Sequence, residues 1–202
     1  DGGPAPPKWE TINAEMPDRV IKLPDNEIAP EEMVVIAANA GDVADWGHGV
    51  LDVPAAWKLS KGKGAKVAVL DTGCDFGHRD LKRVTGKDFT GSRSGAADVN
   101  GHGTHCLGVV GADENGEGVV GVAPEADMIS GKVLGDNGSG LSSWIANGID
   151  WAISEKVDVI SMSLGSDAPD QRIGAAVERA RQAGIIVVAA AGNSGPRENT
   201  AG

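Results

Sequence analysis

Residues 66–75, with the sequence KVAVLDTGCD, decide the fold. The first five residues form a short apolar run that is rich in β-branched side chains, which is typical of a buried strand. The run ends at Asp71, and Gly73 allows the chain to turn sharply just after it. The carboxyl ends of the strands are where parallel α/β sheets place their functional groups, so Asp71 is a candidate functional residue.

Three further apolar runs have the length and composition of buried strands: 127–134, 157–164 and 185–190. Between them, residues 141–156 and 170–183 place apolar side chains on one stripe at spacings of three and four, which predicts amphipathic helices. Apolar strands joined by amphipathic helices predict an α/β fold, a doubly wound and mostly parallel sheet with helices on both faces. The strand-end rule then selects Asp71, Asn193 and residues 163–166.

Charge and hydropathy restrict the partners that we expect. The 202 residues carry 29 acidic and 18 basic side chains, a net charge of −11, which argues against a phosphate-binding surface and so against nucleic acid as a partner. The longest apolar run, 185–191, is far shorter than the ~20 residues of a membrane-spanning helix, so we expect no membrane partner either. Two cysteines, Cys74 and Cys106, allow at most one internal disulfide.

Residues 1–40 differ from the rest of the chain. Five of the ten prolines lie in residues 1–28, and no helical or strand periodicity extends over a useful length there. We interpret residues 1–40 as an N-terminal extension. It is either a pro-segment remnant that acts as an inhibitory tail or a solvated linker, and composition favours the linker.

The segment 100–106, NGHGTHC, supplies histidines that a strand-end aspartate can use. An Asp-Thr-Gly triplet also marks aspartic proteases, but they need two such triplets, and this chain has one. Asp71 alone also fits a turn or helix cap. His102 and His105 are three residues apart, as two metal ligands on a helix are, yet no acidic or cysteine partner lies at a recognised metal-site interval. The glycines that flank His102 favour an imidazole that faces a substrate.

Five motifs in order carry a specific resemblance: VAVLDTGCD (67–75), NGHGTHC (100–106), GVVGVAPEAD (118–127), SMSLG (161–165) and AAAGN (189–193). From residue 46 to the end, the chain resembles the subtilisin family of serine proteases, and the first and third motifs are most similar to the intracellular subtilisins. The resemblance implies a subtilisin-like domain over residues 41–202, of which this chain is the amino-terminal part.

The resemblance implies roles for three residues and one substrate class. His102 is expected to be the general base, Asp71 to fix the tautomer of its ring, and Asn193 to donate its amide to the oxyanion. A peptide or protein substrate is expected to lie as an added strand between two segments. They contain Gly138, Ser139 and Gly140, and Ser163, Leu164 and Gly165.

The resemblance also implies calcium as a cofactor. The expected ligands are oxygen atoms, the kind that Ca²⁺ prefers: the side chains of Asn115, Asp80 and Asp42 and the carbonyls of Asp113, Glu117 and Val119. The alternative is an acidic polar loop without a metal.

The serine that the family uses as its nucleophile is expected well beyond Asn193, in a GTSMA-like segment that these 202 residues do not contain. We therefore expect a serine endopeptidase with an Asp-His-Ser triad, whose serine-bearing segment is supplied by a continuation of the chain or by a second chain. The alternatives are a catalytically inactive, peptide-binding relic and, more distantly, a metal-dependent hydrolase that uses His102 and His105. The similarity to intracellular subtilisins gives a slight lean to the cytoplasm.

Overall fold

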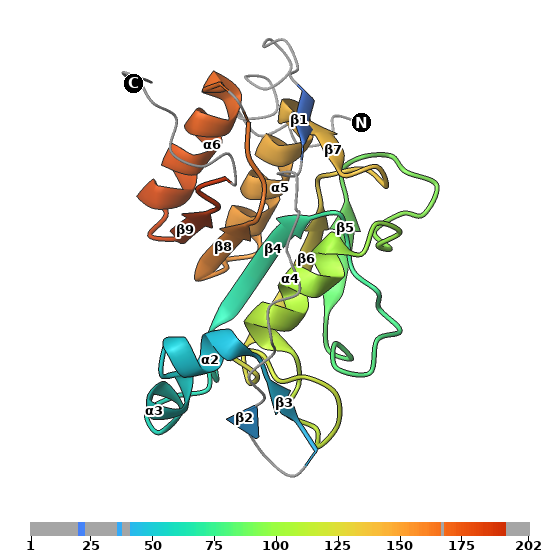
Figure 1. Cartoon of the computed structure of the whole chain (residues 1–202). Helices are drawn as coiled ribbons and strands as arrows, with labels where there is room; N and C mark the ends of the chain where they lie inside the picture. The colour runs from blue at the N-terminus through green and yellow to red at the C-terminus, as the bar shows by residue number, and fades with distance from the viewer. Residues whose placement is uncertain (1–19, 23–35, 38–40, 167, 193–202) are drawn as a thin grey trace, which may run out of the picture.

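A five-stranded parallel sheet forms the centre of the molecule (Figure 1). The structure, a computed structural model, describes residues 20–22, 36–37, 41–166 and 168–192. The sheet strands are β4 (Lys66–Asp71), β5 (Thr85–Asp88), β6 (Asp127–Lys132), β8 (Val159–Met162) and β9 (Ile186–Ala189), and their spatial order is β5-β6-β4-β8-β9. Every pair of neighbours in this sheet is parallel. The α/β fold class predicted from the sequence is confirmed.

Helices pack on both faces of the sheet. From β4 the chain goes to the edge strand β5, returns to β6 beside β4, and then continues on the other side of β4 to β8 and β9. Helix α4 (His102–Gly111) lies in the connection from β5 to β6, and α5 (Ser142–Ser154) and α6 (Gln171–Gln182) lie in the connections from β6 to β8 and from β8 to β9. Helix α4 packs on β4 and β6, whereas α5 and α6 belong to the other face. The strand order changes direction at β4, which ends at Asp71.

Two apolar clusters hold these layers together. The larger contains Leu70, Ile149, Ile160 and Ala176 and lies between the sheet and α5 and α6. The smaller contains Val69 and lies under α4. Strand β9 differs from the other apolar strands, because Ile186 is 62% exposed and Val188 is 51% exposed. One side of β9 is therefore left uncovered by the described residues.

Short elements lie at the two ends of the sheet (Figure 1). β2 (Ile36–Ala37) pairs with β3 (Val43–Ala44), next to α2 (Trp46–Val50) and α3 (Val53–Trp57), near the start of β4. β1 (Val20–Lys22) pairs antiparallel with β7 (Ser139–Leu141), near the end of β4. The backbone of residues 20–22 thus pairs with the predicted substrate segment.

The strongest sequence patterns gave the correct elements. All four predicted strands and both predicted helices are present, and Asp170 caps α6 by accepting from two of its first backbone N–H groups. β5, with the sequence TGKD, was not predicted, because it is a largely exposed and polar edge strand. None of the helices in the described part of the chain is long and apolar enough to cross a bilayer.

Candidate active site

Asp71 and His102 are 31 residues apart in the chain and in direct contact in the structure. Asp71 is the last residue of β4, and His102 is the first residue of α4. The His102 Nδ1 and Asp71 Oδ1 atoms are 2.8 Å apart. An ionised carboxylate can only accept, so this bond puts the proton of a neutral His102 ring on Nδ1 and leaves a lone pair on Nε2. The contact between Asp71 and His102 that the resemblance implies is present.

The Asp71 carboxylate is buried completely. Its Oδ1 also accepts from the Thr72 backbone N–H at 2.7 Å, while its buried Oδ2 has no hydrogen-bond partner among the described residues. The hydrogen bond to Asp71 raises the pKa of His102 and outweighs the opposite effect of burial, and the negative charges of Asp71 and Asp98 add to the rise. The site therefore favours an imidazolium that is held by a buried carboxylate.

Asp98 joins the Asp71 loop to the first turn of α4. Its Oδ1 accepts from the Thr72 hydroxyl and from the backbone N–H groups of Asn100 and Gly101. Its Oδ2 accepts from the backbone N–H and the hydroxyl of Thr104. Burial tends to raise the pKa of Asp98, but these hydrogen bonds outweigh it and the pKa lies below its usual value. Thr72 completes the joint, because its hydroxyl also accepts from the Gly103 N–H at 2.8 Å.

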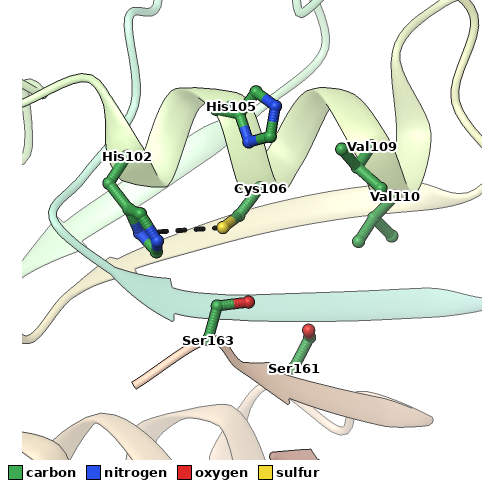
Figure 2. A pocket seen from close by; sticks show the side chains of 7 residues that line it. All are labelled: His102, His105, Cys106, Val109, Val110, Ser161 and Ser163. Carbon is green, nitrogen blue, oxygen red and sulfur yellow. Dashed lines mark hydrogen bonds between the residues drawn. The ribbon is translucent and has the colours of Figure 1, made fainter. Parts of the chain in front are cut away.

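A pocket of about 550 Å³ opens beside His102. Its lining consists of residues of α4 and of β8 with its end: His102, His105, Cys106, Val109, Val110, Ser161 and Ser163. Figure 2 shows Ser161 and Ser163 across the pocket from the α4 side chains His102 and Cys106. The Cys106 sulfur lies 3.7 Å from His102 Nδ1, and burial, followed by the charge of Asp71, raises the pKa of Cys106 to about 12. Its thiol is therefore protonated at neutral pH.

Metal-binding groups gather at one place within the described residues. Ligand atoms of Asp71, His102 and Cys106 all lie within 4.8 Å of one another. His105 is exposed and is not part of this group. The pair that the metal-hydrolase hypothesis needs, His102 and His105, is thus not brought together with a third ligand in this part of the chain.

The two predicted substrate segments lie at strand ends. Gly140 pairs with Ile21 of β1, and an added Cβ at Gly140 would lie 2.3 Å from the Val133 carbonyl oxygen, so only glycine fits there. Gly138 has a φ of +75° and precedes β7, which contains Ser139. Ser163, Leu164 and Gly165 directly follow β8, and of these Ser163 lines the pocket with His102. Asn193 lies outside the described residues.

Four of the six predicted calcium ligands meet around one loop. Asp42 and Asp80 are both buried. Asp42 accepts from the N–H groups of Asn115 and Gly116, and Asp80 accepts from the Asn115 side-chain amide and the Val119 N–H. For Asp113 and Glu117 the expected ligands are the backbone carbonyls, and their side chains lie near arginines: Asp113 bonds to Arg83, and Glu117 lies 3.6 Å from Arg79. The two buried carboxylates therefore face backbone and side-chain N–H groups of the loop.

Three residues that hold the site together were not found from the sequence: Asp98, Lys132 and Asp136. Asp98 has a sequence signal, since it lies four residues before a helix start whose N-cap residue, Gly101, has no side chain. Lys132 has another, because it is a lone cation inside an apolar strand pattern. Asp136 gave no signal that distinguishes it from a turn residue.

The chain belongs to the subtilase family of serine proteases, whose family model matches residues 62–202. It is 49% identical over 152 residues to the intracellular serine protease of Paenibacillus polymyxa, an alignment that covers 72% of this chain and 47% of that protein. It is 49% identical over 154 residues to the major intracellular serine protease of Bacillus subtilis strain 168, with 72% of this chain and 48% of that protein covered.

A third relative matches more of this chain. Subtilisin E of Bacillus subtilis strain 168 is 37% identical over 206 residues, which cover 98% of this chain and 54% of that protein. The chain thus spans about half the length of the curated relatives that it matches. The resemblance predicted from the five motifs is confirmed.

Proposed function

We propose that this chain supplies the aspartate and the histidine of the catalytic triad of a serine endopeptidase, and that a segment outside these 202 residues supplies the nucleophilic serine. The observation that carries this proposal is the 2.8 Å contact between the buried Asp71 carboxylate and His102 Nδ1. The names of the relatives, which are serine proteases, support the same reaction class. The intact Asp71–His102 pair also favours a peptidase over the inactive relic.

Each residue has a defined task in this proposal. His102 Nε2 takes the proton of the serine hydroxyl as that oxygen attacks the peptide carbonyl, and later gives the proton to the leaving amine. Asp71 keeps the other ring proton on Nδ1 and stabilises the imidazolium that forms. Asn193 is proposed to donate its side-chain amide to the oxyanion. In subtilisin, from which this magnitude comes, such a donor lowers the activation barrier by roughly 3 to 4 kcal/mol.

A fluorophosphonate probe tests the proposal, since it reacts only with a serine that a base has activated. We expect the protein expressed from its complete gene to be labelled and to cleave peptides, and the His102→Ala variant to lose both properties. His105→Ala is the matched control for loss of a pocket-lining imidazole, because His105 lies on the same helix and lines the pocket, whereas the bond to Asp71 is made by His102. A complete protein that binds peptides but is never labelled would favour the relic.

We propose further that residues 20–22 occupy part of the substrate edge. Their support is the antiparallel register that pairs Val20 with Leu141, Ile21 with Gly140 and Lys22 with Ser139. A substrate that adds a strand to β7 competes for the same backbone groups. The inhibitory interpretation of residues 1–40 follows from this competition.

Removal of residues 1–22 tests the competition. We expect KM for a peptide substrate to fall, because the substrate no longer displaces a bound strand, while kcat at saturation stays nearly the same. Removal of residues 1–12 is the control, since it shortens the chain and leaves the pairing segment. Equal KM values for the full protein and both shortened forms would contradict the competition.

We propose calcium as a stabilising ion at the loop that Asp42 and Asp80 hold. The support for this site is the burial of these two carboxylates and the hydrogen bonds that place both of them against residues 115–119. An ion there would neutralise two buried carboxylates and fix the loop between α4 and β6; it takes no part in the proton transfers.

A further inference from the structure

Lys132 is a buried cation that the proposed mechanism does not use. It is the last residue of β6, its register partner in β4 is Asp71, and its side chain is 0% exposed. A buried charge is costly unless every hydrogen-bonding group on it is satisfied. Its position at the carboxyl end of β6, next to Asp71, places that cost at the proposed active site.

The ammonium group of Lys132 has three N–H donors, and three acceptors surround it. Nζ donates to the Thr72 carbonyl at 2.6 Å, to the Ala97 carbonyl at 3.1 Å and to Asp136 Oδ1 at 2.9 Å. These acceptors belong to three separate segments of the chain. One side chain therefore fixes the distances among all three.

The first two segments hold the Asp71–His102 pair. The Thr72 N–H donates to Asp71 Oδ1, and the Thr72 carbonyl accepts from Lys132, so both backbone groups of this residue are fixed. Ala97 immediately precedes Asp98, which holds the start of α4. Lys132 thus anchors both the loop that orients the carboxylate and the loop that holds the histidine.

The third segment leads to the predicted substrate edge. Asp136 accepts from Lys132 and from the Ser94 hydroxyl, and the bond to Lys132 holds the pKa of Asp136 below its usual value. The neighbouring Gly135 N–H donates to the Ser139 carbonyl at 2.7 Å, and Ser139 begins β7. The same ammonium is therefore connected to the backbone that is proposed to pair with substrate.

We propose that Lys132 is a positioning residue that aligns the Asp71 carboxylate with His102 and holds the substrate edge beside them through Asp136. This inference rests on the proposed function, because it assumes that Asp71, His102 and β7 serve catalysis. Lys132 acts through Thr72, Ala97 and Asp136 and does not itself touch the reacting atoms.

Lys132→Met separates positioning from a simple charge effect, because methionine keeps the length of the side chain and removes its charge and its donors. The charged or titratable groups that face His102 are Asp71, Asp98 and Cys106. Loss of a nearby cation alone raises the pKa of His102, since the imidazolium is then less repelled. Loss of alignment lowers the pKa of His102, because the hydrogen bond to Asp71 is the largest cause of its rise.

The measurement is an NMR titration of the His102 ring in the protein expressed from its complete gene, together with kcat and KM for a peptide substrate. For Lys132→Met we expect the pKa of His102 to fall toward its ordinary value, and kcat to fall roughly ten- to a hundredfold, as a misplaced catalytic group predicts. Lys66→Met is the control: Lys66 begins the strand that Asp71 ends and pairs with Glu155 at the surface. A pKa of His102 in Lys132→Met that equals or exceeds the control value would overturn the proposal.

Asp136→Ala provides the second variant, which keeps the proposal testable if Lys132→Met does not fold. The Asp136 side chain is 43% exposed, so its removal spares the core. We expect faster hydrogen exchange at the Gly135 and Gly138 amides and a several-fold rise in KM, with kcat changed less. Exchange and KM values equal to those of Lys66→Met would overturn the link to the substrate edge. Failure of the proposed function is distinguishable from failure of the Lys132 proposal. The first appears as unchanged turnover in His102→Ala, whereas the titration of His102 tests the role of Lys132 and needs no turnover.

Discussion

At the scale of single residues, the chemistry depends on where the proton of His102 lies. The bond to Asp71 raises the pKa of the ring above its ordinary value of 6.5. The protonated ring cannot act as a base, so activity is lost at pH values below the raised pKa. The effect on stability runs the other way: this contribution to folding is complete below pH 6.5 and is lost as the pH rises through the raised pKa.

We therefore predict that the acidic limb of kcat/KM against pH has its midpoint above pH 6.5 in the complete protein. Asp98→Asn should move this midpoint to lower pH, because the charge of Asp98 contributes to the raised pKa. Kinetics over a pH series and the NMR titration of the ring should agree. A midpoint at or below 6.5, with no response to Asp98→Asn, would contradict the assignment of His102 as the base.

Part of the site was predictable residue by residue. Asp71 was found because it directly follows an apolar strand, and parallel α/β sheets place functional groups at the carboxyl ends of their strands. His102 was found because its flanking glycines favour an imidazole that faces a substrate, and because NGHGTHC is one of the five motifs that resemble the family. Lys132 and Asp136 were missed, because their importance comes from contacts with Thr72 and Ala97, which no local pattern encodes.

At the scale of elements, the site depends on how closely α4 approaches the loop after β4. Gly103 permits this approach: an added Cβ would lie 2.4 Å from the Gly73 carbonyl oxygen and 2.9 Å from its nitrogen. Both obstacles are backbone atoms, so the helix itself would have to move. Such a movement would separate His102, which is next to Gly103, from Asp71.

Gly103→Ala should therefore destabilise the fold by about 1–3 kcal/mol, as overpacking usually does, and reduce kcat. Gly108→Ala in the same helix is the control, because an added Cβ there meets no atom within 4 Å and alanine favours a helix by up to about 1 kcal/mol. Thermal unfolding and turnover of both variants provide the comparison. Equal behaviour of the two variants would refute the role of this close approach.

The sequence predicts long periodic elements better than short ones. β4, β6, β8 and β9 each carry a dense apolar run, and α5 and α6 each carry an apolar stripe. β1, β2 and β3 contain two or three residues; β1 pairs with the distant strand β7, and β2 pairs with β3. No local signal of hydrophobicity or turn chemistry distinguishes such short strands from loops.

At the scale of the whole molecule, the proposed calcium site brings together three parts of the chain. Asp42 precedes β3, Asp80 lies between β4 and β5, and the loop itself connects α4 to β6. An ion that binds only the native state stabilises it by mass action, by about 2.7 kcal/mol at a hundredfold excess over Kd. For a domain of this size that corresponds to a rise in Tm of roughly 5–10 °C.

We predict that a calcium chelator lowers Tm and that Asp80→Asn abolishes this response. Asp52→Asn is the matched control, since Asp52 is exposed and lies outside the loop. Differential scanning calorimetry with and without calcium measures the effect. A Tm that does not respond to chelation in the unsubstituted protein would contradict the calcium proposal and leave the proposed peptidase unaffected.

The central claim, that Asp71 and His102 act as one catalytic unit, is tested most directly by kcat/KM of Asp71→Asn, His102→Ala and the double variant in the complete protein. Groups that act as a unit lose activity non-additively. The account predicts that each single variant loses most activity and that the double variant is no worse than His102→Ala alone. Losses that multiply in the double variant, or turnover that survives His102→Ala, would contradict it.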